Sequence, residues 1–394
     1  MRDRRGELVR LLAALLSLVA LACRAGSVGP ADPLESSARV RTLEAQLAAV
    51  PGYTAEWREW FAQLSRLNVR SQPTEPLFLQ AETERPLYDD DLLRRLMEPS
   101  PPGTPVSGPI PTILDVSRQL RARGIDLLVV PVPPRSAVYP ELFVPDHAPV
   151  APGELPPLLD YRLRQLYLRL EKEGVEVLDL LPTFLVHRYE YAPGTRRRTP
   201  RYAQLLYMRQ DPHWSAYATD LAASVLARRI ARYPWFPDVV TRFGRAHVET
   251  SVTPVKAPGF TAQELIKAGR LDAGYPPDRF FFFHARIAGE RWSHDDATSP
   301  ILLMGDSFAM PYWGLPDQLL ARLRMRVDLV AVAGGVQSSQ LRAVQLRNGL
   351  DGKRLVVWEI CAHSLINISQ WTPTDLGPTE VAPPPHDETG AALR

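Results

Sequence analysis

From about residue 113 onward, the hydrophobic positions of the chain repeat one unit: an amphipathic helix, a glycine and a short apolar run. Ile113, Val116 and Leu120 recur at helical spacing, Gly124 follows them, and residues 125–132 are mostly apolar. A glycine commonly ends a helix, and a short apolar run between turn signals is typical of a strand buried on both faces. The first unit therefore predicts a helix that leads into a buried strand.

The same unit recurs through the rest of the chain. The further expected helices lie at residues 159–170, 319–323 and 340–346, and the further expected strands lie at 175–180, 301–304, 327–332 and 355–360. Repeated helices and buried strands predict an α/β fold, namely a three-layer αβα sandwich with a mainly parallel sheet and right-handed crossovers.

The segments that flank this region differ from it in composition. The expected organisation is a signal peptide or N-terminal membrane anchor at 1–22, a helical lead-in at 23–74, one α/β domain at 75–370 and a disordered tail at 371–394. The lead-in carries apolar residues at helical spacing, among them Val40, Leu43 and Leu47. The tail is rich in proline, acidic residues and threonine, a composition that favours disorder.

Two irregular inserts interrupt the repeat. Residues 188–209 are basic and rich in tyrosine, and residues 236–298 contain a run of four phenylalanines, Phe280 to Phe283. The phenylalanine run and the apolar stretch at 77–80 are each expected to form a strand.

The N-terminus has the pattern of an export signal. Four arginines stand among the first ten residues, and the apolar stretch 11–22 that follows is too short for an ordinary membrane span of about 20 residues. Ala20, Leu21 and Ala22 before Cys23 fit a cleavage site and also approximate a lipoprotein box. Cleavage, lipidation of Cys23 and retention as an anchor all place the rest of the chain outside the cytoplasm.

Composition narrows the function only a little. The chain has 394 residues, is 45% hydrophobic and carries a net charge of +2, so it can build a real core and gives no indication of nucleic-acid binding. Its two cysteines are Cys23 and Cys361, and because Cys23 lies at the processing site, no disulfide is expected within the mature chain. The sequence has no cluster of cysteine and histidine, so no metal is predicted, and no cofactor is expected.

Candidate chemistry appears where the strand at 301–304 runs into Gly305, Asp306 and Ser307. Open α/β sheets place their ligands at the carboxyl ends of the strands, and a serine there is a nucleophile if a base takes its proton. The alternative is that Asp306 and Ser307 only cap the turn and the helix that follows.

Of the eight histidines, His213 has an acid in the most informative position, in Asp211-Pro212-His213. Ser215 is a good N-cap for the periodic helix that follows. Pro212 biases Asp211 towards an extended conformation, in which residues i and i+2 point to the same side. Asp211 could then accept a hydrogen bond from Nδ1 of His213 and leave Nε2 for a serine, or both side chains could simply cap the helix.

Together, the two motifs favour a Ser-His-Asp triad and acyl transfer. Ser307 would attack an ester carbonyl, His213 would act as base and then as acid, and Asp211 would orient the ring. The backbone N–H groups of Ser307 and Gly335 are the expected oxyanion donors, although Gly334-Gly335 equally fits an ordinary turn. We predict that Nε2 of His213 lies within hydrogen-bond reach of Oγ of Ser307, at the carboxyl edge of the sheet.

A buried strand followed by Gly-Asp-Ser resembles the SGNH hydrolase superfamily. The order in this chain, Asp-x-His-Trp first and Gly-Asp-Ser later, is similar to the AlgX/AlgJ group of polysaccharide O-acetyltransferases. Three further stretches resemble that group, at 123–142, 174–184 and 353–365, so that the resemblance covers about 75–367. The chain departs from the group's pattern at Arg135, where lysine is frequent, and at Cys361 and His363, where proline and arginine are common.

The resemblance implies an exported O-acetyltransferase of the periplasm or cell envelope. Such an enzyme forms an acetyl-serine and passes the acetyl group to a hydroxyl of an exported polysaccharide, alginate-like or another, with a membrane-bound O-acyltransferase as the acetyl donor. Tyr312 and Trp313 are candidate sugar-stacking residues, although Trp313 equally fits packing beneath the loop. The alternatives are a carbohydrate esterase with the same triad and a non-catalytic component of a secretion complex.

Overall fold

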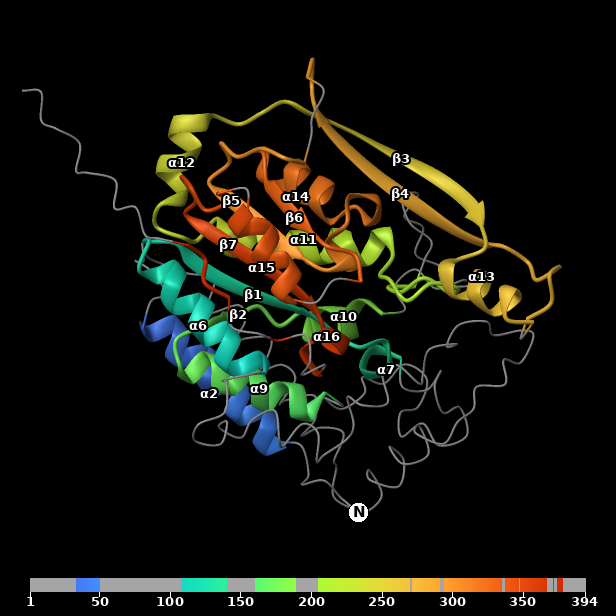
Figure 1. The fold of residues 1–394 in the computed structure, drawn as a ribbon, viewed down its shortest axis with the longest axis horizontal. Helices are drawn as coiled ribbons and strands as arrows, with labels where there is room; N and C mark the ends of the chain where they lie inside the picture. The colour runs from blue at the N-terminus through green and yellow to red at the C-terminus, as the bar shows by residue number, and fades with distance from the viewer. Residues whose placement is uncertain are drawn as a thin grey trace, which may run out of the picture.

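A parallel β-sheet runs through the centre of the protein, and helices cover both of its faces (Figure 1). The computed structural model describes residues 33–49, 108–139, 160–188, 205–269, 271–290, 294–334, 337–346, 348–366, 371 and 374–377. The strands of the sheet are β1 (Asp126–Val132), β2 (Glu176–Val177), β5 (Ile301–Gly305), β6 (Asp328–Ala331) and β7 (Leu355–Cys361). Their order is β2-β1-β7-β5-β6, and all neighbouring pairs are parallel, which confirms the predicted fold class.

The helices divide into two layers because successive side chains of a strand point to opposite faces. Leu128 and Val130 of β1 belong to one core, and Leu127 and Val129 belong to the other. The first core includes α10 (Leu181–His187), α11 (Ala216–Ile230), α12 (Phe236–Phe243) and α14 (Leu315–Leu323). The second includes α2 (Pro33–Ala49), α6 (Pro109–Arg121), α9 (Tyr161–Lys172), α15 (Gln337–Leu346) and α16 (Ala362–Ile366).

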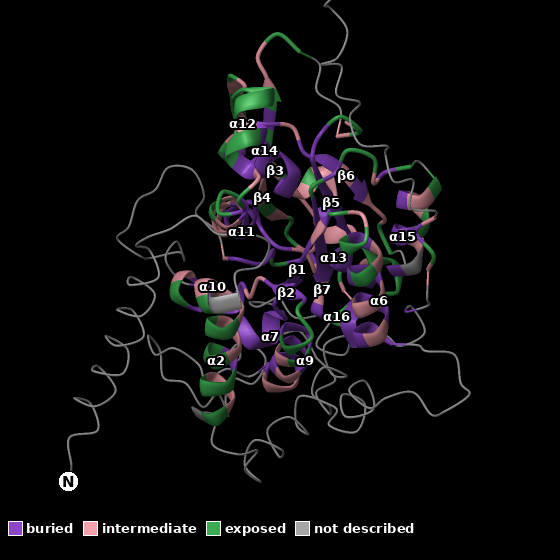
Figure 2. Ribbon diagram, turned by 90° about the vertical axis from the view of Figure 1, so that its left-hand side faces the viewer, coloured by how far each residue is buried: buried purple, intermediate pink, exposed green. Residues whose placement is uncertain are grey.

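Because helices pack on both faces of the sheet, its strands are continuous apolar runs in the sequence. Every residue of β5 is buried, and so is every residue of β7 except Cys361 at its end. The buried strands form the interior in Figure 2, with exposed residues gathered on the outer helices. One expected strand is shorter than predicted, because β2 at the edge of the sheet keeps only two residues of the stretch 175–180.

The insert at 236–298 is more regular than the sequence suggests, so the expectation of an irregular segment there is wrong. It contains α12 and an antiparallel ribbon of β3 (Val248–Ala257) and β4 (Asp278–Ile287), with α13 (Phe260–Lys267) between the two strands. The strand expected at the phenylalanine run is confirmed as part of β4. The ribbon is separate from the central sheet and lies along one side of the molecule (Figure 1).

The segment expected to be a disordered tail contains packed residues at its start. Trp371 is fully buried, its ring lies 5.7 Å from that of Trp358, and its Nε1 donates a 2.9 Å hydrogen bond to the carbonyl of Ser364. Leu376 is buried in the same core. A single tryptophan among prolines is a weak signal in a sequence, yet here it packs against Trp358 of β7, while Gln119 of α6 hydrogen-bonds to the backbone of Thr374 and Leu376.

Several predicted segments lie outside the described residues: the N-terminal segment 1–22, most of the lead-in, the strand at 77–80, most of the basic insert and the end of the tail. The proposed domain boundaries therefore stay predictions. Within the described residues, no helix combines the length and the apolar character needed to cross a membrane.

Candidate active site

A short hairpin carries Asp211 and His213. Tyr207 pairs with Trp214 in an antiparallel bridge, and the hydrogen bond from the N–H of Met208 to the carbonyl of His213 is 3.1 Å long. Ser215 then caps α11, because its hydroxyl accepts a hydrogen bond of 3.3 Å from the N–H of Ala218, as the sequence predicts. The hairpin and the cap fix the loop at the start of a long buried helix.

Ser307 follows the carboxyl end of β5. The turn before it is so tight that position 305 has to be glycine. A Cβ atom on Gly305 would lie 2.4 Å from Oε2 of Glu359 and 2.6 Å from Cβ of Ala309, which is closer than side-chain atoms approach. Asp306 caps the turn, since its Oδ1 accepts a 3.0 Å hydrogen bond from the N–H of Phe308. The short helix Ser307–Ala309 follows, so Asp306 has the capping role that the sequence offered as an alternative.

The fold brings these two distant motifs into contact. Nε2 of His213 lies 2.8 Å from Oγ of Ser307, and Nδ1 lies 2.6 Å from Oδ1 of Asp211. The predicted contacts are therefore confirmed. With Nδ1–H donating to the carboxylate, Nε2 is the acceptor for the Ser307 hydroxyl, which is the arrangement that a general base requires.

Asp211 is held as a buried carboxylate. Only 6% of its surface is exposed, and its oxygens accept backbone hydrogen bonds from the N–H groups of Phe260 at 3.0 Å and His213 at 3.1 Å. Burial raises the pKa of Asp211, but the hydrogen bonds and the charge of His213 outweigh burial and lower the pKa below its ordinary value. The group therefore stays ionised and can stabilise a protonated His213 ring.

The insert that carries α13 supports this loop directly. Gly259 packs so closely on Gln210 that a Cβ atom would lie 2.2 Å from the Gln210 carbonyl oxygen. The same carbonyl accepts a 3.1 Å hydrogen bond from the N–H of Thr261, and Nε2 of Gln210 donates to the carbonyl of Pro276 at 2.8 Å. The insert and the loop of Asp211 and His213 therefore form one hydrogen-bonded unit.

A buried acid that belongs to neither sequence motif lies beneath the Ser307 turn. Glu359 of β7 is fully buried, and its Oε2 accepts a 3.1 Å hydrogen bond from the N–H of Asp306. Burial, and secondarily the charge of Asp306, raises the pKa of Glu359 well above its usual value, which favours the neutral carboxyl in the folded protein. In the sequence, the only sign of this group is one acidic residue inside an otherwise apolar strand.

The expected oxyanion donors are only partly described. Among the described residues, the N–H of Ser307 has no hydrogen-bond acceptor, which leaves it available for a substrate oxygen. Gly335, the second expected donor, lies outside the described residues.

Aromatic rings enclose the His213 side chain. The Trp313 ring stacks on it at a centroid distance of 4.5 Å and an interplanar angle of 23°, and the Phe308 ring lies 4.7 Å away. Tyr312 is 42% exposed beside Trp313, and burial together with the charge of Asp211 raises the pKa of its phenol. Both residues predicted as sugar-stacking candidates therefore lie at the site, and Trp313 also packs against the His213 ring.

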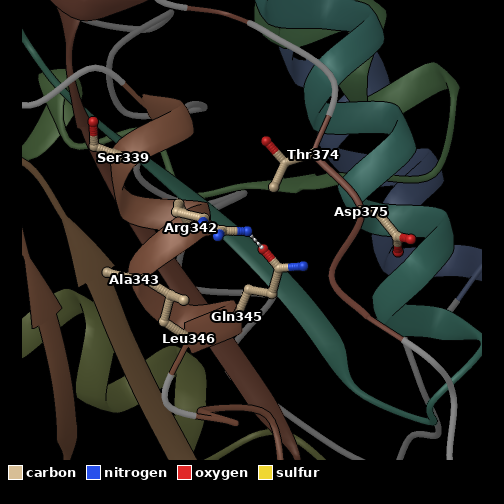
Figure 3. A pocket seen from close by; sticks show the side chains of 7 residues that line it. All are labelled: Ser339, Arg342, Ala343, Gln345, Leu346, Thr374 and Asp375. Atoms are coloured by element: carbon tan, nitrogen blue, oxygen red, sulfur yellow. Dashed lines mark hydrogen bonds between the residues drawn. The ribbon is translucent and has the colours of Figure 1, made fainter.

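Two other features of the described residues stand apart from this site. No group of three or more His, Cys, Asp or Glu side chains in that part of the chain is arranged to hold a metal ion. A surface depression lies between α15 and residues 374–375 (Figure 3), and none of its lining residues belongs to the Ser307 site. Arg342 and Gln345 on its wall hydrogen-bond to each other, so the arginine faces its own helix.

Comparison with known proteins assigns the chain to a family. The family of the SGNH hydrolase-like domain of the acetyltransferase AlgX matches residues 101–362. The chain belongs to this family. Membership supports the acyltransferase class and the SGNH-like fold.

Solved structures of AlgJ and AlgX are among the chains that this protein resembles. The O-acetyltransferase domain of Pseudomonas putida AlgJ is 19% identical, with 73% of this chain and 86% of that chain covered and a TM-score of 0.49. Pseudomonas aeruginosa AlgX is 20% identical, with 66% of this chain and 58% of that chain covered and a TM-score of 0.48. A DHHW family protein from Eubacterium siraeum is 10% identical, with coverage of 67% and 90% and a TM-score of 0.36. A search of curated proteins found no match.

Proposed function

We propose that this AlgX-family protein is an O-acetyltransferase that moves an acetyl group to a hydroxyl of an exported polysaccharide through an acetyl-Ser307 intermediate. The observation that carries the proposal is the line of contacts from Asp211 through His213 to Ser307, at 2.6 and 2.8 Å, in a chain of acetyltransferase family.

In the first half-reaction, Oγ of Ser307 attacks the carbonyl carbon of an acetyl ester, and its proton passes to Nε2 of His213. Asp211 stabilises the charged ring, and the N–H of Ser307 donates to the oxyanion. The carbon–oxygen bond to the donor alcohol then breaks, and that alcohol leaves with the proton from His213. Ser307 now carries the acetyl group as an ester.

In the second half-reaction, a hydroxyl of the polysaccharide takes the place of the departed alcohol. His213 accepts its proton, the sugar oxygen attacks the acetyl carbonyl, and Ser307 recovers its proton when the acetyl-serine bond breaks. Water could perform the same attack, so transfer requires that a sugar hydroxyl reach the ester more readily than water. The Trp313 and Phe308 rings beside His213 support such exclusion of water.

We also propose a location and partners for this enzyme. The export signal at residues 1–22 supports a periplasmic or cell-envelope enzyme, with lipid or membrane attachment at the N-terminus as a further part of the proposal. The proposed acetyl donor is a membrane-bound O-acyltransferase, and the acceptor is an exported polysaccharide, alginate-like or another.

Incubating the pure protein with a soluble acetyl ester tests the proposal. Mass spectrometry should find one added acetyl group, on the peptide that contains Ser307, and unacetylated oligosaccharides should remove it while they gain acetyl groups. The Ser307→Ala variant is the control and should stay unmodified.

Other outcomes would identify the alternatives. Acetate release that no oligosaccharide changes would identify an esterase. Unchanged polymer acetylation in cells that carry only Ser307→Ala would identify a non-catalytic component of a secretion complex.

A further inference from the structure

A row of aromatic rings leads from His213 onto the β3–β4 ribbon. The Trp313 ring stacks on His213, the Phe282 ring lies 6.4 Å from that of Trp313, and the Phe280 ring lies 5.3 Å from that of Phe282. Tyr312 joins the row with its ring 4.7 Å from that of Trp313. We call Phe280, Phe282, Trp313 and Tyr312 the aromatic track.

The ribbon part of the track is not core packing. Along β4, Phe281 and Phe283 pack into the core beside α11 and α14, whereas Phe280 and Phe282 alternate with them and point to the other face, where both are half-buried. Thr253 of β3 is paired with Phe282, so its exposed hydroxyl lies on the same face as that ring. Rings next to hydroxyl groups suit sugars, which have apolar C–H faces and polar edges.

Exposed rings also gather where the track meets the triad. Tyr312 is 42% exposed and Phe260 is 56% exposed, and both residues border Asp211. The backbone N–H of Phe260 donates to the Asp211 carboxylate, and burial together with the charge of that carboxylate raises the pKa of Tyr312. Exposed aromatic side chains next to a polar site are typical of a ligand-binding surface.

We infer that the aromatic track binds consecutive sugar residues of the acceptor polysaccharide. The inference rests on the proposed function, since that function supplies a glycan as the occupant. The ring contacts are continuous from Phe280 to His213, so a chain stacked on them would bring one sugar hydroxyl to the acetyl group on Ser307. The rings follow one another in a row, so an oligosaccharide can contact more of them than a single sugar can.

Calorimetric titration of the full mature protein tests this assignment, with no acetyl donor present. The probes are unacetylated oligosaccharides from one to six residues long, in an uncharged β-1,4-glucan series and a uronic-acid series. At least one series should bind more tightly as the chain lengthens. Phe280→Ala and Phe282→Ala should each weaken binding of the longest oligosaccharides roughly tenfold, as removal of a central aromatic contact does. Phe243→Ala, which removes an exposed ring of α12 outside the track, should leave the affinity unchanged.

Unchanged affinity in both track variants would overturn the assignment, and so would a failure of every oligosaccharide to bind the wild-type protein. If Phe280→Ala does not fold, Phe280→Tyr and Phe280→Leu replace it. Tyrosine keeps the ring and should keep the affinity, whereas leucine keeps only apolar bulk and should lose it. Equal affinity in these two variants would show packing rather than stacking.

Acetylation of Ser307 in the wild-type protein is measured separately, so that the two hypotheses can fail independently. If Ser307 is acetylated and the track variants bind as the wild type does, only the track is wrong. If Ser307 is never acetylated but the track variants lose affinity, the track stands as a glycan-binding site and the proposed reaction is wrong.

Discussion

The backbone N–H of Phe260 donates a 3.0 Å hydrogen bond to Oδ2 of Asp211, across 49 residues of sequence. Because Asp211 is buried, loss of this donor would leave a carboxylate oxygen without a partner, at a cost of about 1–3 kcal/mol. The segment between α12 and β5 is therefore part of the candidate active site and more than a surface insertion.

Gly259→Ala should damage the site without touching the triad. The added Cβ would meet the Gln210 carbonyl oxygen at 2.2 Å, which is backbone and cannot turn aside, so the loop that holds Asp211 must move. A displacement of about 1 Å near reacting groups can cost roughly a hundredfold in rate, and we expect a loss of that order in kcat/KM for acetyl transfer.

The matched control for this change is Gly274→Ala, in the same insert. There a Cβ atom would meet only the side-chain oxygen of Asp272, at 3.0 Å, and a side chain can move aside. Equal activity in the two variants would show that the packing of Gly259 on Gln210 does not position the loop.

The three residues of the triad should behave as one unit. Ser307→Ala and His213→Ala should each lower kcat/KM by roughly 10⁴-fold or more, and the double variant should lose no more than either single one. Asp211→Ala should lower kcat/KM about tenfold less than either of these variants, because the His213 ring can still act as a base without its carboxylate partner. Additive losses in the Ser307/His213 double variant, measured with a soluble acetyl ester, would contradict a shared mechanism.

Glu359→Gln should change how stability depends on pH. Burial and the charge of Asp306 raise the folded-state pKa of Glu359, so its stabilising contribution is present below the unfolded-state pKa of about 4.3 and is lost as the pH rises towards the folded-state value. Glutamine cannot ionise in the unfolded chain. The variant should therefore gain stability relative to the wild type as the pH rises above about 4.

Urea unfolding at a series of pH values measures this gain as the difference in unfolding free energy between the two proteins. Glu264→Gln, a surface change on α13, serves as the comparison and should show no such rise. A difference between wild type and Glu359→Gln that stays constant with pH would mean that Glu359 is ionised in the folded protein.

Cys361 should react with thiol reagents more slowly in the folded protein than after unfolding. Its Sγ lies 3.2 Å from Oγ of Ser364, and burial, followed by the charge of Asp306, raises its pKa well above the ordinary value. Because the thiolate is the reactive form, modification of the folded protein should be at least about tenfold slower than in denaturant. Titration of the denatured, unreduced protein should find one thiol per mature chain, and zero in a monomer would mean that Cys23 is retained and bonded.

The sequence predicts the parts of the site that depend on residue type. Ser307 and His213 are visible because each stands at a recognisable boundary, a buried strand or a capped helix, and parallel strands bring their carboxyl ends to one edge. The contact of Asp211 with His213 is local, since the two residues are two positions apart, and Pro212 favours the extended geometry that it needs.

The supporting contacts leave much weaker signals. Phe260 contributes its backbone N–H, which every residue but proline has, and Gly259 is needed only because Gln210 happens to pack on it. The β3 strand has mostly exposed residues, so it lacks the apolar pattern that marked the central strands. Glu359 is one polar position in an apolar run, and its partner, the N–H of Asp306, depends on the strand order.

The position of β7 has a consequence for the order of assembly. This strand is the last of the sheet in sequence, yet it lies between β1 and β5 and pairs with both, so it joins the two halves of the sheet. It also brings Glu359 under the Ser307 turn. A chain that is synthesised N-terminus first therefore has no finished nucleophile turn until nearly all of it is available to fold. Formation of the site is then one of the latest and most non-local steps of folding, and a chain that stops short of β7 cannot fold into an active fragment.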